Sequence, residues 1–362
     1  MPPSLAICVI NFQGCDVLAG TLAAVCAQVP APDEIVVIDN ASTDGGLDLV
    51  RDRFPQVRII ALPENQGPGP AREAGLRAVG TDLVGFVDND VVPMPDCFCR
   101  LTAALTAADG ATLAMPRVVH ADEPQRIQFE GARAHFIGLM ALDAAEQLVH
   151  EPATGPRAIS SIVTACFLVD RRRWGSVRLQ DPSFFIFHED HDLGLRAGQL
   201  GHRIVAVPRA LCRHGKGTHG LSARRAHGYT PRRVVFMIAN RWRILLTRYE
   251  LRTLVLLAPS LLTFELCQLA GAIAKGWTGS WAEAAATIRK DLPKIAVERR
   301  QWAAQRRFGD GHVLEGGALP FHPRFLAGTT ERWIGHIVSG AIALNWRLVR
   351  GLLRDAPTGG RG

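Results

Sequence analysis

The sequence LVGFVDNDVVP, residues 83–93, joins an apolar run of strand character to two aspartates one residue apart. Side chains at positions i and i+2 of an extended chain point to the same side, so Asp88 and Asp90 are expected to project together. Removing unpaired carboxylates from water costs free energy, which a bound cation offsets. Oxygen ligands suit Mg²⁺ or Mn²⁺, and substrate phosphates usually complete such sites. The alternative is a plain turn, because Asp-Asn-Asp is also favourable turn chemistry.

Similar apolar runs lie on both sides of this stretch and alternate with amphipathic segments. Strands are predicted over residues 4–12, 34–40, 57–62, 82–90, 111–116 and 202–208, and helices over 16–28, 44–54, 70–79, 96–107 and 188–201. Near-continuous Ile and Val runs separated by helices indicate parallel strands covered on both faces. We therefore predict an α/β fold with a Rossmann-like, mostly parallel sheet flanked by helices. Further strands are expected in RIQFEGARAHFIGLMAL and ISSIVTACFLVDRR, within residues 120–185.

The charge of the chain changes sharply near residue 230. Residues 1–230 carry 21 Lys and Arg against 25 Asp and Glu, a net charge of −4, whereas residues 231–362 carry 20 against 9, a net charge of +11. This asymmetry predicts different partners for the two parts. The length of 362 residues allows two domains or one large domain with an appendage. The eight cysteines form no CxxC pair, which favours buried, reduced thiols over disulfides or zinc.

The basic rear part, residues 231–362, has an interfacial character. A mostly apolar run over 252–275 approaches the roughly 20 residues of a membrane span, but Pro259 and Glu265 interrupt it. A later segment, 333–354, places Trp and Arg beside apolar faces. These features favour a peripheral or re-entrant attachment over a true span. No signal peptide is visible, so the front part is expected to fold in the cytoplasm.

Two further clusters follow predicted strands of the front half. Asp39 ends the second strand, where its carboxylate can accept from a nucleobase N–H or a ribose hydroxyl, and Ser42 and Asp44 come just beyond it. Capping of the following helix is the alternative role for Asp44. The segment ENQGPGPAREAG, residues 64–75, offers close backbone approach and free helix N–H groups to a diphosphate. In such sheets ligands bind beyond the carboxyl ends of the strands.

The segment FHEDHDLGLR contains a third acidic cluster at the start of a predicted helix. Glu189 and Asp190 belong to it, and one carboxylate could act as general base for an acceptor hydroxyl. Plain capping is equally consistent with these residues, since a helix N-terminus favours anions. A zinc-protease HExxH motif is not formed, because His188 and His191 are three residues apart rather than four. His214, in a Gly-rich loop, is either a surface residue or a metal ligand.

Over about residues 4–220 the chain resembles glycosyltransferase family 2, inverting enzymes with the GT-A fold. The resemblance rests on an ordered set of motifs, which read CVINF, IVVIDNASTDGG, NQGPGPAREAGL, LVGFVDNDVVP, TACFLVDRR, FHEDHDLGLRAGQLGHRIVAVP and CRHGKGT. Bacterial rhamnosyltransferase-like members, which also have basic, membrane-seeking C-terminal helices, are the most similar. The resemblance implies a GT-A catalytic domain over 1–230, with a donor half about 1–118 and an acceptor half about 119–230. A basic, helical, membrane-associating region follows over 231–362.

The resemblance also implies roles for single residues. The DND sequence would be the DxD motif, with Asp90 the principal metal and diphosphate ligand and Asp88 facing the ribose or the metal. Asp190 would be the catalytic base with Glu189 supporting it, and His214 would be a metal ligand. The implied donor-binding residues are Asn11, Asp39, Ser42, Asp44, Arg72, Asp88, Asn89 and Asp90.

These features together predict an enzyme that depends on Mg²⁺ or Mn²⁺. It would transfer a hexosyl or deoxyhexosyl group from a nucleotide-diphosphate sugar to a lipid-linked or glycan acceptor, at the cytoplasmic face of the cell membrane. The basic rear part is expected to lie on an anionic membrane surface. No nucleic-acid partner is expected, because the positive charge lies among interfacial helices without interleaved aromatics. A catalytically degenerate nucleotide-sugar-binding subunit and a nucleotidyltransferase remain alternatives.

Overall fold

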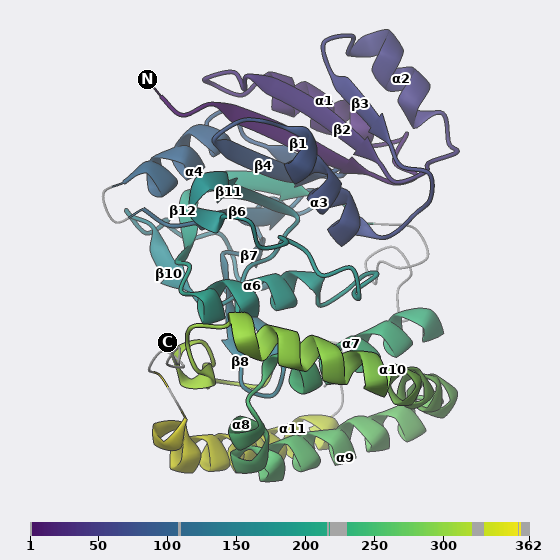
Figure 1. The fold of residues 1–362 in the computed structure, drawn as a ribbon, viewed down its shortest axis with the longest axis vertical. Helices are drawn as coiled ribbons and strands as arrows, with labels where there is room; N and C mark the ends of the chain where they lie inside the picture. Colours follow the sequence, from purple (N-terminus) through teal and green to yellow (C-terminus); the bar gives the residue numbers. More distant parts are fainter. Residues whose placement is uncertain are drawn as a thin grey trace. The chain divides into compact units, whose positions relative to one another are not determined.

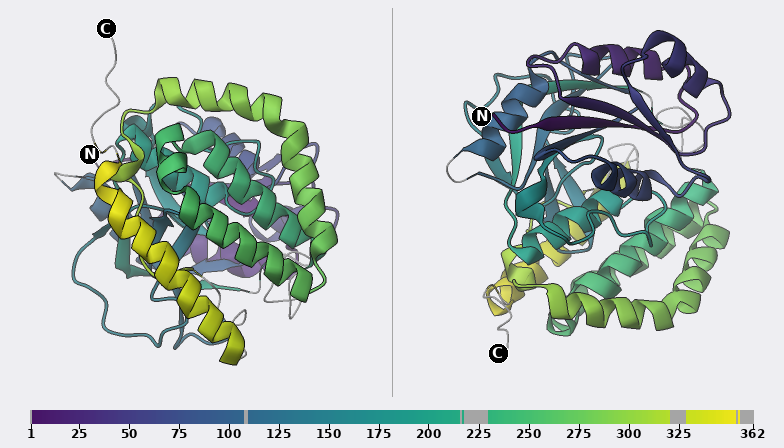
Figure 2. Two further views of the ribbon diagram at one scale, coloured as in Figure 1. Left: turned by 90° about the horizontal axis from the view of Figure 1, so that it is seen from below. Right: turned by 45° about the horizontal axis from the view of Figure 1, so that its top comes forward.

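The computed structural model describes residues 2–107, 110–215, 217, 230–320, 329–353 and 355. The chain forms two compact units (Figures 1 and 2). The first unit comprises Met1–Ala132, Leu142–Leu193 and His202–Tyr229, and the second comprises Arg133–Ala141, Gly194–Gly201 and Thr230–Gly362. The boundaries predicted from the sequence, near residue 118 between the donor and acceptor halves and at residue 230 after the catalytic domain, stay predictions.

The first unit is built on a 10-stranded sheet in which the strand order is β10-β12-β6-β11-β4-β1-β2-β3, with β5 paired to β12 and β7 to β6. The strands are β1 (Leu5–Asn11), β2 (Glu34–Asp39), β3 (Arg58–Ala61), β4 (Leu83–Asp88), β5 (Val91–Pro93), β6 (Leu113–His120), β7 (Ile127–Phe129), β10 (Arg157–Ile159), β11 (Cys166–Asp170) and β12 (Ile204–His214). The central strands β1, β2 and β4 are buried almost throughout, as their apolar runs predict.

The register of the parallel strands brings the predicted site residues to one edge of the sheet. β1 pairs in parallel with β2 and β4, so that Asn11 lies opposite Asp39 and Ile10 lies opposite Asp88. All three strands therefore end at the same level, at their carboxyl ends. This is the edge at which ligands bind in sheets of this class.

The sheet is mixed rather than wholly parallel. β11 lies between β4 and β6 and is antiparallel to both. It is also shorter than the apolar segment ISSIVTACFLVDRR. Only Cys166–Asp170 of that segment forms the strand, and the short helix α5 (Arg171–Trp174) follows directly. The segment RIQFEGARAHFIGLMAL is divided among β7, β8 (Gly131–His135) and β9 (Leu139–Asp143). Gly138 has a φ of 79° in the turn between β8 and β9, a conformation that favours glycine.

Helices flank the sheet, as Figure 1 shows. They are α1 (Leu18–Cys26), α2 (Gly46–Arg53), α3 (Pro68–Ala78) and α4 (Cys97–Thr106). A further helix, α6 (Glu189–Leu200), begins with residues of the first unit. α3 begins with a proline at its first turn, where no intrahelical N–H is needed. Gly75 lets this helix approach the sheet closely, because a Cβ there would lie 3.1 Å from Cys8 Sγ.

The second unit is mainly helical, with α7 (Pro231–Arg248), α8 (Leu251–Leu256), α9 (Ala258–Ala274), α10 (Thr278–Gln305) and α11 (Thr329–Val349). The apolar run over 252–275 is split between α8 and α9 near Pro259. α9 and α11 lie side by side, and Ser260 Oγ lies 2.6 Å from Asn345 Oδ1 (Figure 2). Within the described residues, no helix combines the length and hydropathy that crossing a membrane requires.

Candidate active site

The first group of site residues lies where β1, β2 and β4 end. Asn11 Nδ2 donates to Asp39 Oδ1 at 2.7 Å, and Asn11 Oδ1 accepts from Asn89 Nδ2 at 2.8 Å. The other oxygen of Asp39 accepts from the backbone N–H of Ser42 at 2.8 Å. Asn11 and Asp39 are buried, so this chain of hydrogen bonds fixes the ends of three neighbouring strands relative to one another.

Asp44 fixes the loop that follows β2. Its Oδ2 accepts from the backbone N–H of Cys15 at 2.8 Å, and its Oδ1 accepts from that of Gly46 at 3.1 Å. Gly46 is the first residue of α2, whose N-cap residue is Gly45 without a side-chain cap, so Asp44 contacts the helix start but is not its cap. Because the same side chain also holds the loop after β1, Asp44 brings the two loops together.

A second group forms around the buried guanidinium of Arg72. Its Nη2 lies 2.6 Å from Asp88 Oδ1, and its Nη1 lies 3.8 Å from Glu189 Oε1. Burial raises the pKa of Asp88, and the charge of Arg72 opposes that rise. The Arg72 side chain on α3 therefore brings the acidic motif at the end of β4 together with the acidic motif that opens α6.

The third group contains Asp90 and His214. His214 Nε2 lies 3.3 Å from Asp90 Oδ1, while His214 Nδ1 lies 2.6 Å from Gln128 Oε1. A carbonyl oxygen cannot donate, so Nδ1 carries a proton and Nε2 is the ring nitrogen that faces the Asp90 carboxylate. A proton or a cation between Nε2 and Oδ1 would bind to both atoms. The backbone N–H of Gly217 donates to the other oxygen of Asp90 at 2.6 Å.

This donor set fits a divalent metal. One carboxylate and one imidazole are ligands that Mn²⁺ accepts, and the hydrogen bond to the second ring nitrogen orients the imidazole as in many metal sites. Asp88 makes a different contact, the ion pair with Arg72, so its predicted role as a metal ligand stays a prediction.

The backbone that leads into α6 is strained. Phe187 and His188 have φ values of 65° and 64°, a left-handed conformation that residues with a side chain rarely adopt. Such outliers occur preferentially at functional sites, where the surrounding structure holds them in place. Here the strained pair directly precedes Glu189 and Asp190, so it sets the direction in which α6 presents its first carboxylates.

The two carboxylates at the start of α6 differ in pKa. Burial raises the pKa of Glu189 to about 8, and the neighbouring charge of Asp190 raises it further, while Arg72 lowers it. Burial also raises the pKa of Asp190, to about 6, with the backbone N–H of His191 and Arg72 lowering it. That N–H donates to Asp190 Oδ1 at 2.7 Å. At neutral pH, Asp190 is therefore mainly ionised and Glu189 mainly protonated.

Sequence reasoning did not anticipate Gln128 or Ser161. Gln128 lies between Ile127 and Phe129 in β7, and a polar residue alternating with two buried apolar ones is a recognisable signal. Ser161 Oγ lies 3.2 Å from His191 Nδ1, and both residues are buried. His191, which had no assigned role, therefore packs inside the first unit beside Ser161. No pattern in the sequence marks Ser161.

Residues 6–152 match the family model described as glycosyl transferase family 2. The matched segment contains every predicted site residue from Asn11 to Asp90. The chain carries a glycosyltransferase family 2 domain. The sheet and its flanking helices have the GT-A fold, as predicted.

The relatives that match the chain include proteins named for succinoglycan biosynthesis and for L-rhamnosyl transfer. The chain is 33% identical over 114 residues to the succinoglycan biosynthesis protein ExoO of Rhizobium meliloti, covering 31% of this chain and 32% of that protein. It is 28% identical over 242 residues to the N-acetylglucosaminyl-diphospho-decaprenol L-rhamnosyltransferase of Mycobacterium tuberculosis, covering 60% of this chain and 77% of that protein. The match thus spans about a third of the first relative's length and about three quarters of the second's.

A crystal structure of GalNAc-T7 with UDP, GalNAc and Mn²⁺ is similar in fold to the glycosyltransferase domain. The TM-score is 0.53 and the sequence identity 15%, and the match covers 67% of this chain and 47% of that one. At this identity the likeness concerns the fold alone.

Proposed function

We propose that the protein transfers a sugar from a nucleotide-diphosphate sugar to a hydroxyl group of a lipid-linked or polysaccharide acceptor, with inversion at the anomeric carbon. The observation that carries the proposal is the placement of Arg72 between Asp88 and Glu189. An inverting transfer needs a group that binds the donor diphosphate and a base for the acceptor within one site. The motifs expected to supply them, DND and HED, meet at this one guanidinium.

The nucleotide is proposed to bind at the ends of β1 and β2. Asp39 already accepts two hydrogen bonds, but its ionised carboxylate has further lone pairs for a base N–H or a ribose hydroxyl. Asn11 and Asn89 would hold that carboxylate in place rather than contact the sugar. Arg72 supports the neighbouring diphosphate position, because its buried Nε has no hydrogen-bond partner among the described residues.

Asp90 and His214 are proposed to hold a divalent cation, Mg²⁺ or Mn²⁺. When bound, the metal neutralises the charge that develops on the diphosphate leaving group. The residues support this because Asp90 Oδ1 and His214 Nε2 face each other at 3.3 Å. Gln128 would fix the ring orientation, and the Gly217 N–H would orient the carboxylate.

Asp190 is proposed as the general base. A base must be ionised at the working pH and have a pKa near it, and a pKa of about 6 meets both conditions. Glu189, with a pKa of about 8, would remain protonated and could donate a hydrogen bond to the acceptor or to the sugar. Asp190 would remove the proton of the acceptor hydroxyl as that oxygen attacks the anomeric carbon from the face opposite the diphosphate.

Transfer and donor hydrolysis by purified protein test this proposal, with a panel of nucleotide sugars and with Mn²⁺ or Mg²⁺. We expect Asp190→Asn and Asp90→Asn each to lower turnover by about 10²-fold or more. Asp48→Asn is the matched control, because Asp48 is an exposed aspartate on α2. Full transfer activity in both site variants would refute the assignment. If a donor raises the melting temperature but none of the donors is turned over in the presence of metal, the protein would instead be the catalytically degenerate subunit.

The second unit supplies a surface for an anionic membrane. Along α8 and α9 the side chains of Leu251, Val255, Leu262, Leu266 and Ile273 are each more than 60% exposed. The spacing within each helix, four residues on α8 and four and seven residues on α9, places the exposed side chains of that helix on one face. On α11, which packs against α9, Ile337, Leu344 and Leu348 are also exposed at spacings of seven and four.

Exposed basic side chains lie close to these apolar stripes in the sequence, at Arg252, Lys275, Arg347 and Arg350. Apolar stripes with nearby basic residues are typical of helices that lie in the membrane interface. Each basic residue near an anionic surface adds about 1 kcal/mol of attraction. We therefore propose that the protein works peripherally at the membrane and receives a lipid-linked acceptor of cell envelope polysaccharide there.

Sedimentation with vesicles tests the membrane proposal. We expect binding to vesicles that contain phosphatidylglycerol, weaker binding to pure phosphatidylcholine vesicles, and a loss of binding in the double variant Leu262→Glu, Leu266→Glu. Leu148→Glu is the matched control, since Leu148 is equally exposed but belongs to the first unit. Equal sedimentation of the double variant and the control would refute the proposed face.

A further inference from the structure

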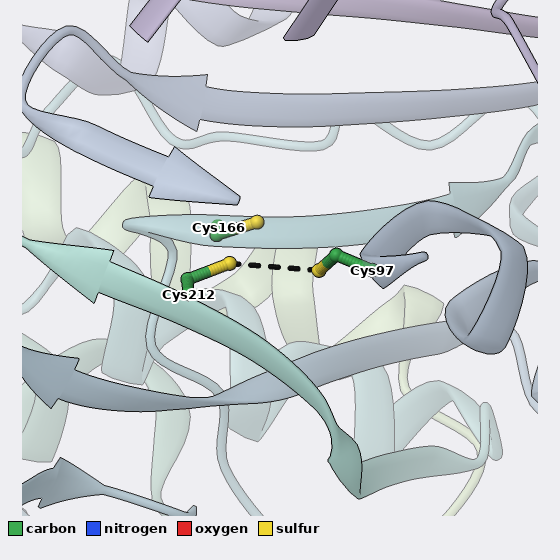
Figure 3. Close-up of side chains that lie close together, drawn as sticks. All are labelled: Cys97, Cys166 and Cys212. Carbon is green, nitrogen blue, oxygen red and sulfur yellow. Dashed lines mark hydrogen bonds between the residues drawn. The ribbon is translucent and has the colours of Figure 1, made fainter. Parts of the chain in front are cut away.

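Three cysteines that are not assigned to transfer meet in the interior of the first unit. Cys97 is the first residue of α4, Cys166 the first of β11, and Cys212 lies near the end of β12. All three have exposures of 0%. Figure 3 shows their thiol groups pointing toward one another from these separate elements.

The distances within this thiol cluster fit a metal centre. All three sulfurs lie within 4.8 Å of one another, and the Sγ atoms of Cys97 and Cys212 are 3.5 Å apart. Thiolates placed about 2.3 Å from a shared ion lie roughly 4 Å apart, which matches this spacing. A disulfide would need a sulfur–sulfur distance of about 2.05 Å, and all three cysteines are free in this structure.

The number and kind of ligands restrict the ion. Among the described residues, no further His, Cys, Asp or Glu joins the three thiols. Structural zinc sites are almost always tetrahedral and closed by a fourth ligand, and Mg²⁺ and Mn²⁺ prefer oxygen. Soft thiolate ligands select Cu(I), which is satisfied by three sulfurs.

We propose that Cys97, Cys166 and Cys212 form a buried, three-coordinate site for a soft, thiophilic cation, with Cu(I) as the ion it fits. The position of Cys97 at the start of α4 supports this, because the free N–H groups of the helix favour negative charge on sulfur. The bound ion would join α4, β11 and β12, of which α4 and β12 are already linked by the hydrogen bond between the Cys97 and Cys212 thiols. β12 ends two residues later at His214, so the ion would also fix the strand that carries a residue of the transfer site.

Anaerobic titration with Cu(I), delivered as its acetonitrile complex, tests the proposal. We expect one ion per chain, a thiolate-to-copper charge-transfer absorption in the ultraviolet, and a higher melting temperature as the ion binds the folded state. Cys166→Ala should weaken binding at least tenfold in competition with a chromophoric Cu(I) chelator. The two matched controls are Cys8→Ala, a buried thiol outside the cluster, and Cys99→Ala, an exposed thiol beside it.

Circular dichroism of each variant without metal establishes that it folds, and Cys212→Ala serves as the second site variant if Cys166→Ala does not fold. Equal Cu(I) affinity in the site variants and the controls would overturn the proposal. So would a Co(II) complex of the wild-type protein with the visible spectrum of four-coordinate cobalt, since that result would require a fourth ligand. Neither readout depends on sugar transfer, so this inference stands or fails apart from the proposed function.

Discussion

Arg72 Nη2 lies 2.6 Å from Asp88 Oδ1, in an ion pair whose guanidinium side chain is only 2% exposed. The same group faces Glu189 Oε1 at 3.8 Å through Nη1. The guanidinium offsets part of the cost of burying these acidic groups. Burial raises the pKa values of Asp88 and Glu189, and Arg72 lowers both of them against that larger effect.

Replacing Arg72 by Met is expected to lower the free energy of unfolding by about 1–3 kcal/mol, because it removes the charged partner of the partly exposed Asp88. Arg77→Met, on an exposed position of the same helix, should change it by less than about 0.5 kcal/mol. Urea unfolding followed by circular dichroism measures both. Equal stability of the two variants would show that the ion pair is not a stabilising contact.

The same replacement should also move the pH dependence of turnover. In the wild-type protein, kcat/KM should rise with pH through about 6, as Asp190 ionises. Arg72 lowers the pKa of Asp190, so Arg72→Met should raise that pKa and shift the rising limb to higher pH. Arg72→Lys, which keeps the positive charge, should leave the limb closer to its original position. If kcat/KM rises at the same pH in all three proteins, Arg72 does not affect the pKa of the general base.

Glu189 should make the folded state less stable as the pH rises. Its pKa is about 8 in the folded protein against about 4.3 in an unfolded chain. Between these values the folded state binds more protons than the unfolded state, so the free energy of unfolding falls with increasing pH. Glu189→Gln removes the titrating group and should flatten this dependence. The melting temperatures of both proteins, measured without metal across this pH range, provide the comparison. The same pH dependence in both proteins would contradict the raised pKa of Glu189.

Gln128 is expected to control metal affinity without being a ligand. Gln128→Leu removes the acceptor of the His214 Nδ1 proton and frees the ring to change its tautomer, which typically costs 10–100-fold in affinity. Mn²⁺ binding measured by electron paramagnetic resonance reports this loss directly, with Gln13→Leu as the control on an exposed glutamine of the first unit. Unchanged Mn²⁺ affinity in Gln128→Leu would remove Gln128 from the site.

The sequence predicts the donor half of the fold well because its signals are local. β1, β2 and β4 are continuous apolar runs with an acid or amide at the end, and parallel pairing then brings Asn11, Asp39 and Asp88 to one edge without further information. The direction of β11 in the sheet, by contrast, cannot be predicted from its own residues. Five residues, Cys166–Asp170, form a strand in either direction, and only its two neighbours in the sheet decide that it runs antiparallel.

The sequence also does not show which residues far apart along the chain pair with one another. The DND motif predicts that carboxylates gather, but nothing in it shows that Asp88 pairs with Arg72 while Asp90 faces His214. Likewise, Glu265 interrupts the apolar run and argues against a membrane span, but the sequence does not show which residue it pairs with. That partner is Arg241 on α7, 24 residues earlier in the chain.

The Arg241–Glu265 pair should be a strong internal contact of the second unit. Arg241 is fully buried, its Nε donates to the carbonyl oxygen of Ile137 at 2.8 Å, and its Cζ lies 4.4 Å from the centre of the Phe264 ring. Glu265→Leu alone leaves a buried cation without its anion and should lower the free energy of unfolding by about 3–5 kcal/mol.

Removing both charges should recover much of that loss, because two apolar side chains of similar volume need no desolvation of ions. A double-mutant cycle with Arg241→Met, Glu265→Leu and the double variant, followed by chemical unfolding, measures the interaction energy between the two groups. Lys294→Met, on an exposed pair with Glu298 in α10, is the control and should change stability by less than about 0.5 kcal/mol. If the double variant is as unstable as the sum of the single variants, the two side chains do not interact energetically, and Glu265 would then be retained for another reason, such as contact with a membrane or an acceptor.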